Sequence, residues 1–213
     1  MGDNMEFGNT ILLTHLAATV IGIITAFYLE LIRSKLCADG NITRQIYRQF
    51  RRGIKACIFA TALLWSTSLI YISYQANISA VLISDPAFWA RVTITAVISY
   101  NLLLITHVAM PMAKKRIGVS IFGGLTKSQQ NKMIAMAAVS GVSWITITVL
   151  GFVELNARGQ DPLAVYGFFI LVYAISLVAG LLLSKLGGRM IRHRFLKRME
   201  KKRIHHRRLA GYL

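Results

Sequence analysis

The sequence predicts an all-α integral membrane protein with five transmembrane helices, its N-terminus outside the cell and its C-terminus in the cytoplasm. Of the 213 residues, 55% are apolar and only 15% are charged, against about 25% charged residues in an ordinary soluble domain. Apolar runs of the roughly 20 residues needed to cross a bilayer recur along the chain. The basic residues gather between alternate runs. These three observations exclude a soluble enzyme.

Five apolar runs are long enough to cross the membrane, and they cover residues 10–32, 54–74, 87–112, 133–153 and 163–184. The first run follows an acidic segment, residues 1–8, rather than a basic one, and no small-residue cleavage site follows it. We therefore expect it to stay as a transmembrane helix and not to be removed as a signal peptide. Residues 1–184 are expected to form one five-helix domain, and residues 185–213 a basic, amphipathic cytoplasmic tail.

The basic residues predict the orientation. All but two of the 25 lysines and arginines lie between runs one and two, between runs three and four, or after run five; the exceptions are Arg91 and Arg158. Acidic residues such as Asp3 and Asp85 lie in the opposite segments. Because basic loops stay in the cytoplasm, the pattern predicts a multi-pass protein of the inner, cytoplasmic membrane with its N-terminus outside.

Local residue patterns predict where three helices begin. Asp85 precedes Pro86 and Asp161 precedes Pro162, and each pair places a capping carboxylate before a proline that is tolerated in a first helical turn. Thr126 and Gln129 have the spacing of a capping box. We expect helices three, five and four, respectively, to begin at these positions.

Small residues at four-residue spacing predict which helix faces pack, because they let helix backbones approach closely in lipid. Such residues occur in runs one, four and five, at Ala18, Gly22 and Ala26, at Ala137 and Gly141, and at Ser176, Gly180 and Ser184. His15 shares the face of Ala18 and Gly22, so we expect its side chain to point into the bundle.

Ionisable groups inside a membrane are costly and indicate function by default. His15 and Arg91 lie about five and four residues inside the outer boundary, so at 1.5 Å per residue both are ~6–8 Å deep. They are predicted to share an outer-face site that binds a cofactor, with haem b as the candidate. His107 lies ~24 Å lower than Arg91 and cannot supply a second axial ligand to the same haem.

Each of these residues also has a structural interpretation. His15 could form an interhelical hydrogen bond. Arg91 follows Trp89, and such a pair is typical of the interfacial aromatic belt, where arginine reaches out to water; its charge could also hold an anion. His107 and Met110 form a candidate soft metal site, or simply the helix end before Pro111.

The order of these residues resembles a known family. Residues 13–18, Leu-Thr-His-Leu-Ala-Ala, lead to Gly22, and Pro86-x-x-Trp89-Ala90-Arg91 opens the third run. This pattern, across residues 10–112, resembles the small bacterial membrane proteins that include the CopD-like copper-resistance domains and the HemJ-type protoporphyrinogen oxidases.

The resemblance implies specific roles for two residues. It places His15 at the family's first-helix histidine and Arg91 where the family has a lysine that follows a tryptophan. Arginine stays protonated and is a poor iron ligand or proton donor. The departure argues against oxidase chemistry but is compatible with an electrostatic role.

Two basic segments are predicted to bind the cytoplasmic membrane surface. Residues 43–55 interleave apolar and basic side chains, as does the tail, and each basic residue near anionic lipid contributes about 1 kcal/mol. We expect residues 43–55 to lie on the inner leaflet before turning into run two. The predicted surface residues are Arg48, Arg51, Arg52, Arg192, Arg194, Lys197 and Arg198. Anionic lipids are the expected partners, and no specific nucleic acid is expected.

The function that these patterns predict is a haem- or redox-metal-associated membrane protein with its site around His15 and Arg91. One alternative is a non-enzymatic accessory or assembly subunit of a membrane complex, in which histidines only fasten helices. Another is a small transporter that depends on Asn101 or His107. The cysteines, Cys37 and Cys57, are interpreted as free thiols because two residues cannot form a disulfide framework.

Overall fold

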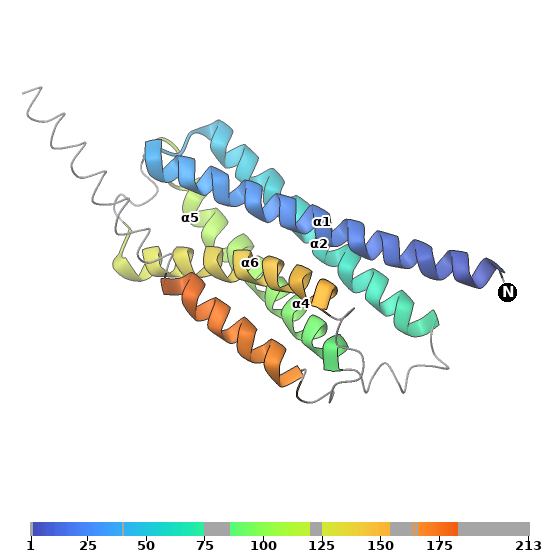
Figure 1. Cartoon of the computed structure of the whole chain (residues 1–213). Helices are drawn as coiled ribbons and strands as arrows, with labels where there is room; N and C mark the ends of the chain where they lie inside the picture. Colours follow the sequence, from blue (N-terminus) through green and yellow to red (C-terminus); the bar gives the residue numbers. More distant parts are fainter. Residues whose placement is uncertain are drawn as a thin grey trace, which may run out of the picture.

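The structure, a computed structural model, describes residues 2–39, 41–74, 86–119, 125–153, 164 and 166–182. Within these residues the regular structure is helical, apart from one isolated bridge (Figure 1). The labelled elements are α1 (Gly2–Asp39), α2 (Arg44–Tyr74), α4 (Pro86–Leu104), the π-helix η1 (Ile105–Ala109), α5 (Met110–Lys114) and α6 (Lys127–Val153). A shorter apolar helix, Tyr166–Leu182, follows α6.

Four segments are long and apolar enough to cross a membrane, namely Glu6–Arg33, Arg44–Ser73, Phe88–Lys114 and Lys127–Leu150. These segments overlap the first four predicted runs. The third segment consists of α4, η1 and α5 together. The fifth predicted run, 163–184, coincides with the shorter Tyr166–Leu182 helix. For the described residues, the prediction of a helical chain with several helices long and apolar enough to span a membrane is therefore confirmed, while five crossings and their orientation stay predictions.

Residues 43–55 are not separated from run two by a turn, so that part of the prediction is wrong. Arg48, Arg51 and Arg52 are exposed, and their role at the membrane surface stays a prediction. The helix α2 continues without interruption from Arg44 to Tyr74, and the Thr43 hydroxyl caps it by accepting the Ile46 N–H at 3.1 Å. The apolar side chains of the first turns, including Tyr47 and Phe50, pack against Ile32, Ile42 and Ala113. The amphipathic pattern thus reflects packing against the bundle.

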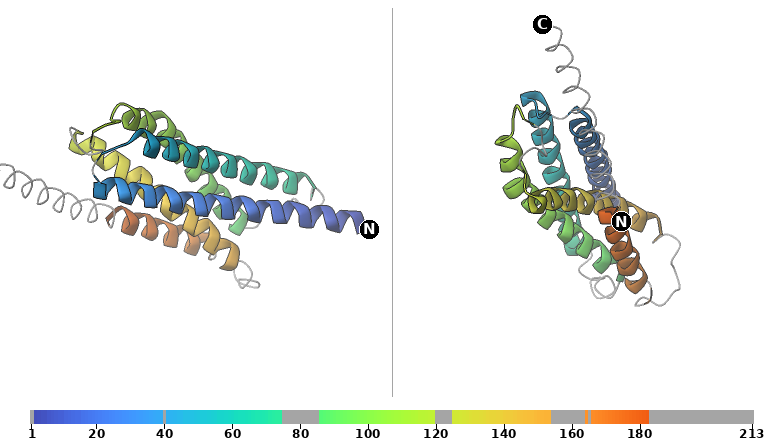
Figure 2. Two further views of the ribbon diagram at one scale, coloured as in Figure 1. Left: turned by 90° about the horizontal axis from the view of Figure 1, so that it is seen from above. Right: turned by 90° about the vertical axis from the view of Figure 1, so that its left-hand side faces the viewer.

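The helices α1 and α2 lie side by side over most of their length (Figures 1 and 2). Their connection is short, and it is tied to the segment after α5. Ile42 donates its N–H to the Val119 carbonyl at 3.1 Å and accepts the Gly118 N–H at 2.8 Å. Gly118 has a φ of 96°, a conformation that glycine adopts without steric cost. These bonds join two interhelical connections at one end of the bundle.

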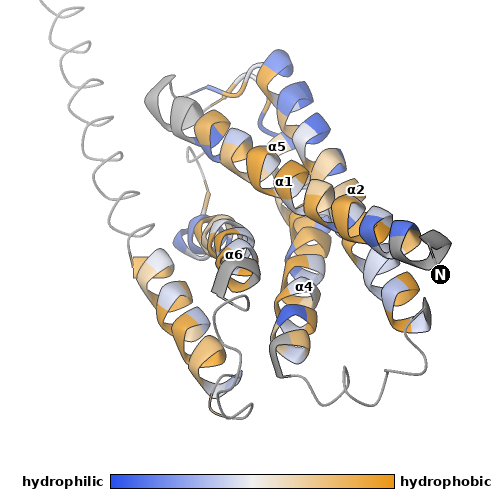
Figure 3. Cartoon of the chain, turned by 45° about the vertical axis from the view of Figure 1, so that its right-hand side comes forward, coloured by the Kyte–Doolittle hydropathy of each residue, from blue (hydrophilic) through white to orange (hydrophobic). Residues whose placement is uncertain are grey.

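We call that end the basic end, because many Arg and Lys residues lie in its segments; Figure 3 shows hydrophilic helix turns there. Its described basic residues belong to the end of α1, the start of α2, α5 with the turn after it, and the start of α6. They are Arg33, Arg44, Arg48, Arg51, Arg52, Lys55, Lys114, Lys115, Arg116, Lys127 and Lys132.

Two of the three predicted helix starts are confirmed. The helix α4 begins at Pro86, and Asp85, its predicted cap, lies outside the described residues. The capping box before α6 is present in both directions, because Gln129 donates its N–H to the Thr126 hydroxyl at 3.2 Å and accepts the Thr126 N–H at 3.1 Å. Asp161 and Pro162 lie outside the described residues, as does the predicted tail with Arg192, Arg194, Lys197 and Arg198.

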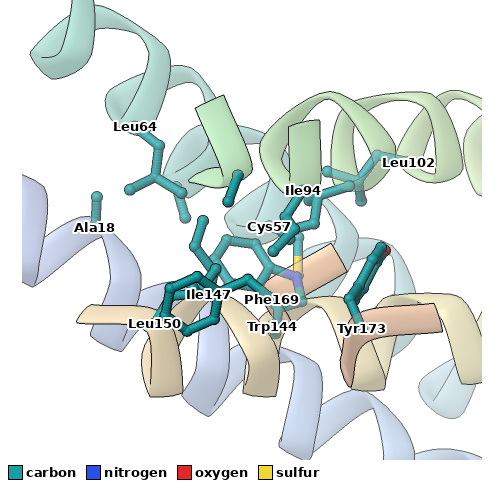
Figure 4. Close-up of a cluster of buried hydrophobic side chains, with 13 residues drawn as sticks. Ala18, Cys57, Leu64, Ile94, Leu102, Trp144, Ile147, Leu150, Phe169 and Tyr173 are labelled. Atoms are coloured by element: carbon teal, nitrogen blue, oxygen red, sulfur yellow. The ribbon is translucent and has the colours of Figure 1, made fainter. Parts of the chain in front are cut away.

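One apolar core joins α1, α2, α4, α6 and the Tyr166–Leu182 helix (Figure 4). Trp144 of α6 is its largest fully buried side chain, with 1% of its surface exposed. The core contains Ala18, Cys57, Ala60, Leu64, Ala90, Ile94, Ile98, Leu102, Trp144, Ile147, Leu150, Phe169 and Tyr173. Large apolar side chains such as Leu12, Phe27 and Leu171 point outward, as expected of helices that contact lipid.

Candidate functional site

A series of side-chain hydrogen bonds joins each helix to the next. Every bond connects two successive long helices, and their lengths lie between 2.7 and 3.0 Å. The pairs are His15 with Thr67, Trp65 with Ser99, Asn101 with the Met136 carbonyl, and Ser143 with Tyr173. Polar side chains in these spans therefore serve helix packing, as hydrogen bonds between membrane helices commonly do.

His15 lies half-buried on α1, and its Nδ1 is 2.8 Å from the Thr67 hydroxyl of α2. The Thr67 hydroxyl is also 2.7 Å from the Leu63 carbonyl one turn earlier. A hydroxyl has one hydrogen. If Thr67 donates it to Leu63, the hydroxyl must accept from His15 Nδ1–H, and the neutral imidazole then carries its lone pair on Nε2.

The charge of Arg91 acts on the His15 imidazole, while a cofactor site shared by the two residues stays a prediction. Helix α1 extends beyond the other helices at its N-terminal end (Figure 1). We call this part of the molecule the His15 end.

The structure does not bring His107 and Met110 together. His107 is exposed on the π-helix η1, whereas Met110 is 8% exposed and packs against Ile54 and Met136. Among the described residues, no group of three or more His, Cys, Asp or Glu side chains is placed to hold a metal ion. Tyr100 is 64% exposed and faces outward like His107.

Asn101 is buried and forms a hydrogen bond between helices. It is 4% exposed, and its side-chain amide donates to the Met136 carbonyl at 2.9 Å. This bond ties α4 to α6. The residue that the sequence suggested for transport is thus engaged in an interhelical contact.

The small-residue faces on α1 and on the Tyr166–Leu182 helix pack as predicted. A Cβ atom added at Gly22 would lie 2.0 Å from the Trp144 ring, and one added at Gly180 would lie 2.7 Å from Val142. Ala18 is fully buried. Neighbouring helices therefore approach these residues closely, as small residues in membrane helices permit.

The face of Ala137 and Gly141 is different. A Cβ atom added at Gly141 would meet nothing within 4 Å. Both residues line a cavity of about 350 Å³ between α1, α2, α4 and α6. The cavity reaches from Trp144 and Cys57 in the core to Arg33 at the basic end. The small residues of α6 thus border an open space instead of another helix.

Trp144 forms the deep wall of this cavity. The edge of its six-membered ring abuts Gly22, so its indole nitrogen lies on the edge that faces away from α1, on the side of Cys57 (Figure 4). The N–H is buried and has no hydrogen-bond partner among the described residues. Cys57 is a free, fully buried thiol, as the sequence predicted.

The sequence analysis missed Thr67, although a signal for it exists. The connection between α1 and α2 is short, so residues equidistant from it lie at the same level. His15 and Thr67 are both 26 positions from Asn41. Leu29 and Gly53 are also equidistant from Asn41, and a Cβ atom added at Gly53 would lie 2.6 Å from the Leu29 side chain.

No family model, curated protein or solved structure matches the chain.

Proposed function

We propose that this chain is an integral protein of the inner membrane that binds haem b at the His15 end, with His15 as the single axial ligand. The hydrogen bond between His15 Nδ1 and the Thr67 hydroxyl supports this proposal. Metal-binding histidines commonly donate their second N–H to a neighbouring acceptor, which fixes the tautomer and the ring orientation. Thr67 provides such an acceptor, and Nε2 is left as the ligand atom.

The residues around His15 fit the charge of the group. Haem b carries two propionate carboxylates, and Arg91, whose charge acts on the His15 imidazole, would supply the positive charge that pairs with them. When bound, haem b supplies one-electron transfer at iron. His107 is about 24 Å from Arg91 along the third span and is exposed, so among the described residues His15 is the histidine that would hold the group.

Absorption spectra of the purified protein, expressed with haem in excess, test this proposal. The wild-type chain should show a Soret band, and His15→Ala should lose it. Thr67→Val keeps the ligand but removes its hydrogen-bond acceptor, so haem affinity should fall by about 10- to 100-fold. His107→Ala is the matched control and should leave the band unchanged. A wild-type protein without a Soret band would contradict the proposal.

The second candidate function is a non-enzymatic accessory subunit of a membrane complex. One observation favours it, namely that the His15–Thr67 bond is one of a series that joins every helix to the next. In this case His15→Ala and Thr67→Val should lower the free energy of unfolding by similar amounts. The wild-type chain and both variants should then bind no haem. Deletion of the chain should then cause loss of a partner complex.

A further inference from the structure

The cavity that Gly141 borders is elongated along the helices. On α1 its lining extends from Ile23 to Arg33, ten residues that rise about 15 Å. One end lies at the buried Trp144 and Cys57, and the other at the basic end. With a volume of about 350 Å³, the space is a narrow slot and not a rounded pocket.

The walls of the slot are apolar over most of this length. Apolar side chains from α1, α2, α4, η1 and α6 form them, including Ile23, Ile54, Leu102, Ile105 and Met136. The space beside Gly141 is not filled by any side chain that the structure describes. A flexible hydrocarbon chain has the polarity and the width that such a slot accepts, whereas a helix, about 10 Å across, is too wide.

Charge distinguishes the two ends of the slot. Arg33 lies in the lining, ion-paired with Glu30. The basic residues of α2, α5 and α6 belong to the same end of the bundle. Glu30 is the one acidic residue there whose side chain the structure describes. A ligand with an apolar chain and an anionic group at one end would match both parts.

We propose that this slot binds one acyl chain of an anionic phospholipid, with the phosphate at the basic end and the chain extending to Trp144. Lipid tails are as apolar as the walls, so burial alone gives little preference over the bilayer. The basic residues near the headgroup make the slot selective for an anionic lipid. The slot is occupied because the acyl chain fills the space beside Gly141. This site is independent of haem binding at the His15 end.

Fluorescence quenching of Trp144 tests the proposal in vesicles. The other two tryptophans are replaced by phenylalanine, as Trp65→Phe and Trp89→Phe. One vesicle preparation carries brominated chains on phosphatidylglycerol in unlabelled phosphatidylcholine, and the other carries them on phosphatidylcholine in unlabelled phosphatidylglycerol. At equal bromine content, the brominated anionic lipid should quench Trp144 at least twofold more strongly, because a chain in the slot ends against Trp144, whereas the surrounding helices separate this buried side chain from bulk lipid.

Two glycine variants control this experiment. Gly141→Leu places a side chain into the slot and should abolish the difference between the two lipids. Gly167→Leu is the matched control, because this glycine also has open space around it and lies outside the cavity lining. Equal quenching by both lipids, or quenching that Gly141→Leu leaves unchanged, would overturn the proposal.

Native mass spectrometry of the wild-type chain provides a measurement that does not need the tryptophan replacements. One phosphatidylglycerol should remain bound per chain, and its occupancy should fall several-fold in Gly141→Leu but not in Gly167→Leu. Retention of phosphatidylcholine at the same occupancy would contradict the assigned headgroup.

Discussion

Gly22→Ala should lower the free energy of unfolding, whereas the same substitution at Gly141 should raise it. Both glycines lie inside long helices, where alanine is favoured over glycine by about 1 kcal/mol. At Gly22 the added Cβ would lie 2.0 and 2.1 Å from two carbons of the Trp144 ring. Since that ring is fully buried, it cannot move without repacking, and overpacking of this kind costs about 1–3 kcal/mol or more.

The two alanine variants therefore differ in sign. At Gly141 no atom of the residues that the structure describes lies within 4 Å of the added atom, so we expect only the gain in helix propensity. Unfolding in mixed micelles with increasing SDS measures both effects in one assay. A Gly22→Ala protein as stable as Gly141→Ala would show that α1 and α6 are not in contact at Trp144.

Trp144→Ala should cause the largest loss of stability of any single truncation in the core. The side chain abuts α1 at Gly22 and belongs to the core to which α1, α2, α4, α6 and the Tyr166–Leu182 helix all contribute. Truncation of a buried tryptophan or phenylalanine to alanine costs about 3–5 kcal/mol, from lost contacts and from the cavity that remains.

Trp144→Phe is the matched variant for this prediction. Phenylalanine keeps most of the apolar contact and removes a buried N–H that has no partner in the part of the chain that the structure describes, and such a donor costs about 1–3 kcal/mol when desolvated. We expect Trp144→Phe to lose less than half of the stability that Trp144→Ala loses in the same SDS titration. Equal losses would show that the N–H makes a bond in the folded state.

Much of this fold could be predicted because a membrane restricts the possible structures. Apolar runs of span length can only be helices or barrel strands in lipid, and alternation of basic loops orders them. The capping box at Thr126 and Gln129 and the proline at Pro86 were readable because caps depend on neighbouring residues alone. These features require no knowledge of tertiary contacts.

The features that could not be predicted depend on contacts between helices. Residues 43–55 have an amphipathic pattern that suits either a lipid surface or a neighbouring helix, and only the packing of Phe50 against the bundle distinguishes the two. The same ambiguity applies to α6, where Gly141 has the spacing of a packing residue but borders a cavity. A sequence pattern identifies a helix face made of small residues, but it does not show which part of the protein covers that face.

The candidate site was predicted in part for the same reason. Depth arithmetic predicts that His15 and Arg91 lie at one level, and this stays a prediction; the structure adds that the Arg91 charge acts on His15. The partner of His15, Thr67, needed the register of the α1–α2 pair, which follows from the short connection at Asn41. His107 and Met110 were grouped by closeness in sequence, yet helical geometry turns one outward and the other inward.

Both the haem site at the His15 end and the lipid slot at the basic end depend on five crossings that place the basic end in the cytoplasm. Cysteine labelling with a membrane-impermeant maleimide tests this most directly, in a Cys37→Ser, Cys57→Ala background. Asp3→Cys should react in intact cells, while Val119→Cys and Leu213→Cys should react only after the membrane is permeabilised. Labelling of positions 3 and 213 from the same side would mean an even number of crossings and would contradict the account.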